Sequence, residues 1–103
     1  ALDILVLSEH AEQGTIIEVM PIGVLVLEDA GKKDSKIIAV PIDKNLRTIK
    51  VTSHKQFESN YATAKFILEL WFLNYKQGST MEFKSWQNEA AAKAEIEQWL
   101  VNK

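Results

Sequence analysis

The sequence predicts an α+β fold in which strands come first and helices follow. Two observations lead to this class. The first half consists of short aliphatic and β-branched stretches separated by polar turns, which is typical of a small barrel or sandwich. In the second half, apolar residues recur at three- and four-residue spacing, which indicates amphipathic helices. The chain has 103 residues, so we expect residues 1–103 to form a single domain.

Strands are expected wherever β-favouring residues form a short run between polar segments. They are residues 2–7, 15–27, 36–42 and 80–86, with a shorter extended piece at 47–51. Pro21 and Gly23 interrupt the second run, which predicts a bulge or a bend there. The polar segment 28–36, with Gly31 inside it, predicts a turn.

Two helices are expected in the carboxyl-terminal half. Residues 59–76 have helical apolar spacing, and Gly78 stands where a helix stop is expected. Asn88 is a suitable N-cap for a last helix through Leu100. In the strand between these helices, simple alternation places Met81 and Phe83 on the face opposite Trp86.

Composition excludes several function classes. A formal net charge of −2, from 12 basic and 14 acidic side chains, argues against nucleic acid or an anionic membrane as a partner. The chain lacks cysteine, which excludes disulfides and thiolate sites and agrees with a cytoplasmic protein. It holds no apolar run long enough for a membrane span. We expect the two histidines, His10 and His54, to be surface residues.

Three aspartates are candidate ligands for a hard cation. Asp3 lies in an aliphatic strand, where a carboxylate is costly unless it is paired or stays wet at the strand start. Asp29 and Asp34 flank a glycine turn, where aspartate is also favoured for backbone reasons. Together the three suggest a Mg²⁺ site, because Mg²⁺ prefers carboxylate oxygens, waters and substrate phosphates.

Basic and phenolic residues accompany these aspartates. Lys36 follows Asp34 by two residues, so both point to one face of a strand, either as an ion pair or around a phosphate. Tyr75 and Lys76 end the predicted long helix. A lysine is favourable there in any case, because of the helix dipole.

The order of motifs resembles the family I soluble inorganic pyrophosphatases of bacterial type. The strings are LDILVL, IGVL, Asp29-x4-Asp34-x-Lys36, AVP at 39–41 and Tyr75-Lys76. The ending W-x-N-x-x-A-A-x-A-E-I at 86–96 is also similar to bacterial members. The resemblance extends over nearly all 103 residues.

The resemblance implies an OB-like five-stranded barrel, incomplete in this chain, with two carboxyl-terminal helices. It implies hydrolysis of inorganic pyrophosphate by a Mg²⁺-activated water. Asp3, Asp29 and Asp34 match metal ligands, and Lys36, Tyr75 and Lys76 match phosphate-binding residues. Bacterial members often form hexamers, so a homo-oligomer is expected, although Leu70 and Asn74 stand where the family has contact histidines.

The chain departs from the family at its start. Asp3 matches the last aspartate of D-x-D-P-x-D, and the first two, including the general base, would lie upstream of Ala1. We therefore expect a carboxyl-terminal portion that retains no catalytic base and is nearly inactive alone. Open strand edges suggest a strand-swapped dimer. The alternatives are an OB-like oligonucleotide-binding module, which the charge disfavours, and a non-catalytic interaction domain.

Overall fold

The computed structural model describes residues 3–9, 14, 16–74 and 80–101. Within these residues the elements are four strands, three α-helices and one turn of 3-10 helix. The strands are β1 (Asp3–Val6), β2 (Val19–Asp29), β3 (Lys32–Pro41) and β4 (Met81–Gln87). The helices are η1 (Lys44–Leu46), α1 (His54–Asn60), α2 (Ala62–Asn74) and α3 (Glu89–Val101). The predicted α+β class is confirmed.

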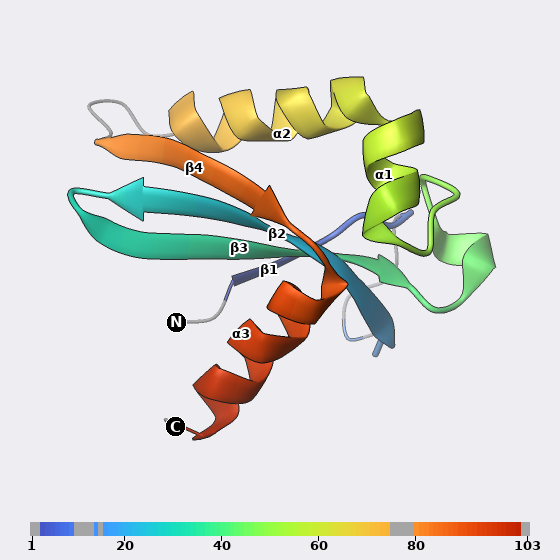
Figure 1. Cartoon of the computed structure of the whole chain (residues 1–103). Coiled ribbons are helices and arrows are strands. Elements are labelled where there is room, and N and C mark those ends of the chain that lie inside the picture. The colour runs from blue at the N-terminus through green and yellow to red at the C-terminus, as the bar shows by residue number, and fades with distance from the viewer. Residues whose placement is uncertain (1–2, 10–13, 15, 75–79, 102–103) are drawn as a thin grey trace.

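The described strands form one open sheet in the order β1-β3-β2-β4. β1 runs parallel to β3, whereas β2 is antiparallel to both of its neighbours. Figure 1 shows α1 and α2 on one side of this sheet and α3 on the other. The sheet is not closed, as expected for an incomplete barrel.

The centre of the molecule is the hairpin of β2 and β3. The predicted turn over residues 28–36 is wrong in its extent, because strand pairing continues to Asp29 opposite Lys32. Only Ala30 and Gly31 form the turn, with φ of 53° and 82°. Positive φ at both central positions is the type I′ geometry, whose twist matches that of the two strands. The polar composition of the segment reflects an exposed hairpin end rather than a long loop.

Two bulges set which side chains share a face. The predicted irregularity at Pro21 and Gly23 is confirmed as a register shift against β3. A second shift, between β2 and β4, was not predicted. It places Trp86 opposite Leu25 and Met81 opposite Asp29, and both Trp86 and Met81 pack on the cluster of Leu25 and Leu27. The simple alternation expected for β4 is therefore wrong, because a bulge reverses the parity of every later residue.

Apolar clusters cover both faces of the sheet. On the α1 and α2 side, Ile22, Ile38, Val40 and Val51 surround Phe57, while Leu25 and Leu27 pack on Phe72. On the α3 side, Val24 and Ile37 pack against Ala92. Burial of each large apolar side chain contributes roughly 1.5–3 kcal/mol, so these contacts hold the helices to the sheet.

The number of helices exceeds the predicted two. α2 and α3 correspond to the predictions, and Asn88 caps α3 by accepting a hydrogen bond from the Ala91 amide at 3.2 Å. The additional α1 begins after Ser53, whose hydroxyl accepts from the Gln56 amide at 3.2 Å. The extended piece expected at 47–51 is only an isolated bridge between Ser8 and Arg47. No helix of the described residues is long and apolar enough to cross a membrane.

Candidate functional site

Strand register brings the three predicted aspartates to the same face of the sheet. Asp3 is the parallel partner of Lys36, and Asp34 is the antiparallel partner of Leu27. Asp29 lies two residues beyond Leu27 on β2. Because side chains alternate along a strand, residues two apart share a face, and Asp29 is a diagonal neighbour of Asp34. This is the face that α2 covers with Phe72.

Lys36 is the meeting point of two of these carboxylates. Its Nζ donates to Asp3 Oδ2 at 2.8 Å and to Asp34 Oδ1 at 3.0 Å. The lysine side chain is 8% exposed, whereas those of Asp3 and Asp34 are 53% and 31% exposed. The Phe72 ring centroid lies 5.7 Å from the same Nζ. The cation is therefore the inner member of the cluster, and the anions are its outer members.

The carboxylates keep Lys36 charged. Burial is the largest single influence on the pKa of Lys36 and lowers it, but the hydrogen bonds to Asp3 and Asp34 outweigh burial, so its pKa is raised. The pKa of Asp3 is lowered, chiefly by the hydrogen bond from Lys36. Both shifts favour the ionised pair.

Asp29 is placed differently from the other two aspartates. Its Oδ1 accepts a hydrogen bond from the Thr80 hydroxyl at 2.6 Å, and its carboxylate is not among the partners of Lys36. The structure thus brings Asp3 and Asp34 together and leaves Asp29 on the same face at the hairpin end. Tyr75 and Lys76, the predicted phosphate-binding residues, lie outside the described residues.

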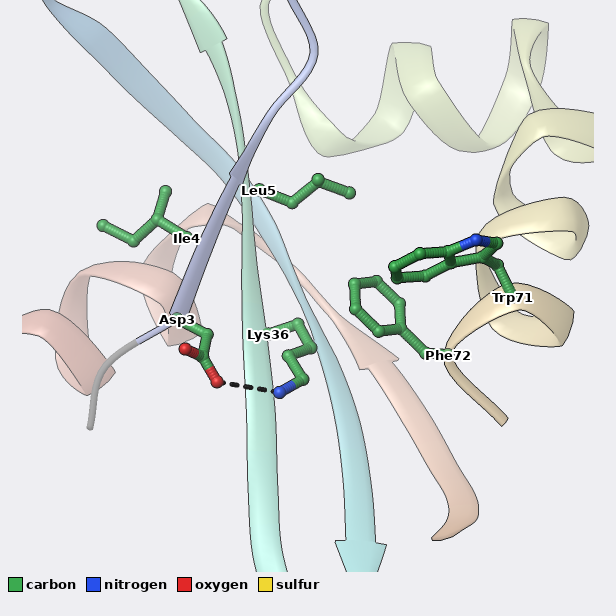
Figure 2. Close-up of a pocket in the computed structure, with 6 residues that line it drawn as sticks. All are labelled: Asp3, Ile4, Leu5, Lys36, Trp71 and Phe72. Atoms are coloured by element: carbon green, nitrogen blue, oxygen red, sulfur yellow. Dashed lines mark hydrogen bonds and ion pairs between the residues drawn. The ribbon is translucent and has the colours of Figure 1, made fainter. Parts of the chain in front are cut away.

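A hollow of about 300 Å³ opens beside the Asp3–Lys36 pair. Figure 2 shows it lined by Asp3, Ile4 and Leu5 from β1, Lys36 from β3, and Trp71 and Phe72 from α2. The contacts of Phe72 with Lys36 and of Thr80 with Asp29 were not predicted from the sequence. Phe72 belonged to a predicted helical apolar face, but no sequence signal indicated which part of the sheet that face would cover.

The cluster fits a divalent cation in its donor chemistry. The Lys36 ammonium occupies the point where carboxylate oxygens of two separate strands converge. Mg²⁺ is commonly held by one or two carboxylates plus waters and phosphates. Among the described residues no group of three or more His, Cys, Asp or Glu is placed to hold a metal. In the part of the chain that the structure describes, the carboxylates that converge on one point are thus the two of Asp3 and Asp34.

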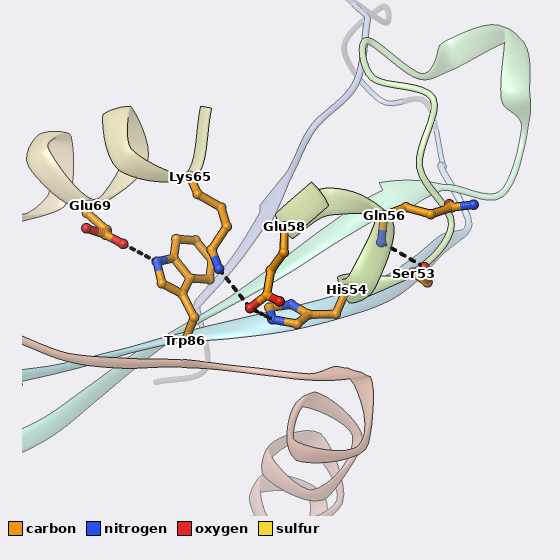
Figure 3. A network of polar contacts seen from close by, with 7 residues as sticks. All are labelled: Ser53, His54, Gln56, Glu58, Lys65, Glu69 and Trp86. Atoms are coloured by element: carbon orange, nitrogen blue, oxygen red, sulfur yellow. Dashed lines mark hydrogen bonds and ion pairs between the residues drawn. The ribbon is translucent and has the colours of Figure 1, made fainter. Parts of the chain in front are cut away.

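A second polar network joins α1, α2 and β4. The expectation that His54 is a surface residue is wrong, because it is 7% exposed. Its Nε2 lies 3.0 Å from Glu58 Oε1, which also accepts from Lys65 at 3.1 Å (Figure 3). Lys65 Nζ lies 4.8 Å from the Trp86 ring centroid, and the indole N–H donates to Glu69. These contacts tie the helices to the sheet.

Comparison with known proteins gives a consistent result. A family model described as "Inorganic pyrophosphatase" matches residues 1–102. Inorganic pyrophosphatase 1 of Pseudomonas syringae pv. tomato is 35% identical over 99 residues, which cover 92% of this chain and 55% of the relative. Inorganic pyrophosphatase of Agrobacterium fabrum is 40% identical over 84 residues, covering 78% of this chain and 46% of the relative.

Solved structures agree with the sequence relatives. An inorganic pyrophosphatase of Coxiella burnetii superposes with a TM-score of 0.77 at 29% identity, covering 94% of this chain and 59% of that one. That of Thermus thermophilus gives a TM-score of 0.76 at 26% identity, covering 93% and 56%. The chain spans about half the length of the curated relatives that it matches.

Proposed function

Because the chain belongs to the inorganic pyrophosphatase family, we propose that it supplies part of the active site of an enzyme that hydrolyses inorganic pyrophosphate to two phosphates. The observation that carries this proposal is the convergence of Asp3 and Asp34 on the buried Lys36 ammonium. Two carboxylates around one cation are what a site for a metal and a phosphate needs, because both signs of charge must be offered within a few ångströms.

In the proposed site, Asp3 and Asp34 would hold Mg²⁺. Asp29, on the same face of the sheet, would hold a cation that accompanies the substrate. Lys36 donates to a phosphate oxygen, and Tyr75 and Lys76 are proposed to do the same. Bound Mg²⁺ supplies charge neutralisation for the diphosphate and lowers the pKa of a coordinated water.

The same assignment predicts little turnover by the 103-residue chain alone. Asp3 and Asp34 would both be taken up in holding the cation, so within the described residues we assign no carboxylate to remove a proton from the attacking water. The chain is therefore proposed to bind metal and diphosphate but to hydrolyse pyrophosphate slowly. We propose that residues 1–103 act as one folding unit in a cytoplasmic protein.

A binding experiment tests the proposal independently of turnover. Titration calorimetry with Mg²⁺ and the non-hydrolysable imidodiphosphate should detect Mg²⁺-dependent binding, which Asp34→Asn weakens by roughly tenfold or more. Asp43→Asn is the matched control. It removes the same charge from the exposed N-cap of η1, where Asn caps as well as Asp. Absence of binding, or equal loss in both variants, would contradict the proposal.

The expected homo-oligomer remains a prediction. Phe66, Ile67, Leu70 and Trp71 on α2 are each about half exposed, which supports an apolar contact surface. Figure 1 places α2 at the periphery, with its other side on the sheet. A non-catalytic binding module is the alternative function, and it requires that neither Mg²⁺ nor imidodiphosphate binds.

A further inference from the structure

The Asp3–Lys36–Asp34 cluster has an unusual order of charges from inside to outside. The side chain exposed at 8% is the lysine, while the aspartates are 53% and 31% exposed. A cation from solvent therefore meets the outer carboxylates first. The oxygens that converge, Asp3 Oδ2 and Asp34 Oδ1, are already engaged by the internal ammonium.

We propose that Lys36 is the resident counter-ion of the metal-free site and is transferred from the two aspartates to a phosphate oxygen when divalent cation and diphosphate bind. This inference rests on the proposed function and adds an order of events to it. In the metal-free state the ammonium competes with the metal. In the loaded state the same ammonium is a ligand of the substrate.

Charge counting supports the transfer. Two carboxylates and one ammonium carry a net charge of −1, whereas a divalent cation added to the same three groups makes it +1. Like charges a few ångströms apart in a partly buried place repel strongly, so a metal on Asp3 and Asp34 disfavours the present position of Lys36. A diphosphate beside the metal neutralises this excess positive charge, and its oxygens offer Lys36 new hydrogen-bond acceptors.

A hollow beside Lys36 leaves room for its side chain to move. Two of the three ammonium N–H groups are used by Asp3 and Asp34. The hollow of about 300 Å³ lined by Lys36, Asp3 and Phe72 adjoins the pair. A flexible lysine can swing into this space, with its Nζ still near the Phe72 ring, without disturbing the β3 backbone.

The competition can be measured with Lys36→Met, which keeps most of the side-chain volume and removes the charge. Calorimetry with Mg²⁺ alone should show affinity about tenfold tighter than in the unchanged chain, because the internal competitor is gone. Addition of imidodiphosphate should tighten Mg²⁺ binding in the unchanged chain and much less in Lys36→Met.

Lys33→Met is the matched control for net charge. Lys33 lies on the same strand, but its side chain is 58% exposed and pairs with Glu95 of α3. Lys33→Met should leave the Mg²⁺ affinity nearly unchanged. Circular dichroism of each variant checks that it is folded.

The outcomes separate this inference from the proposed function. If the unchanged chain binds Mg²⁺ and Lys36→Met binds it equally or more weakly, the counter-ion role is wrong and the metal site stands. If neither chain binds Mg²⁺, with or without imidodiphosphate, the proposed function is wrong and the inference falls with it. Nitrogen-15 NMR of the lysine side chains gives a further readout: the protected Lys36 ammonium signal should move when Mg²⁺ is added.

Discussion

Gly23 is packed so closely that even the methyl group of alanine would overlap with neighbouring atoms. A Cβ built there would lie 2.7 Å from His54 Nδ1 and 2.9 Å from the Gln87 carbonyl oxygen. Ordinary contact begins at 3.4 Å, so the closer atom is 0.7 Å too near. Neither neighbour can yield easily, because His54 is 7% exposed and the other atom belongs to the backbone of β4. We therefore expect Gly23→Ala to strain the junction of β2, β4 and α1.

The magnitude follows from two opposing effects. Overpacking of a filled interior costs about 1–3 kcal/mol. Alanine in a strand interior regains about 0.5–1 kcal/mol of the conformational entropy that glycine loses on folding. The net loss in free energy of unfolding should be about 1 kcal/mol from the middle of both ranges and at most about 2.5 kcal/mol, and a loss of about 1 kcal/mol lowers the melting temperature of a domain of this size by roughly 4–8 °C.

Urea unfolding followed by tryptophan fluorescence measures this loss as a lower midpoint with an unchanged slope. The same substitution is then made in a chain that carries His54→Ala. Without the ring, Gly23→Ala should cost less free energy of unfolding. Gly31→Ala is the control: its Cβ meets nothing within 4 Å, so its cost comes from a φ of 82° and should be equal in both backgrounds. An unchanged midpoint for Gly23→Ala, or the same loss with and without the His54 ring, would refute the steric account.

Two further predictions concern the hairpin end and the α1–α2 network. Ala30→Asn should stabilise the chain by about 0.5–1 kcal/mol in urea, because Asn tolerates the φ of 53° and Asn-Gly suits a type I′ turn; a lower midpoint would contradict it. The pKa of Glu58 is lowered below its unfolded value, chiefly by the hydrogen bond from Lys65 and then by the contact with His54. The stability that these contacts contribute is therefore present above the ordinary pKa of glutamate and is lost as the pH falls through the lowered pKa. The stability difference between the unchanged chain and Glu58→Gln should therefore vanish in acid, and a difference that persists at the lowest pH of folding would exclude this origin.

Local patterns in the sequence predicted most of the elements. Aliphatic and β-branched runs located β1, β2 and β3, the alternating segment 80–86 located β4, and Asn88 marked the start of α3 correctly. The alternation rule worked where strands are regular, as for Asp34 and Lys36 on β3. These signals succeed because they depend on neighbouring residues alone.

The errors came from features that depend on residues far apart in the chain. The bulge that brings Trp86 to the face of Leu25 is defined by pairing with β2, not by the composition of β4. His54 sits in a polar segment, yet the close approach of Gly23 buries it. For the candidate site, residue types indicated which carboxylates are candidate ligands. Their positions depend on strand register, which brings Asp3 and Asp34 to Lys36 and leaves Asp29 hydrogen-bonded to Thr80.

The short parallel strand β1 has one more consequence, for the way the site opens and closes. It is four residues long and lies at an edge of the described sheet, where strands fray most readily. When β1 separates from β3, Asp3 leaves with it and Lys36 loses one of its two carboxylate partners. A ligand that bridges Asp3 and Asp34 therefore also stabilises the pairing of β1 with β3. Slower amide hydrogen exchange along residues 3–6 would report that this ligand is bound.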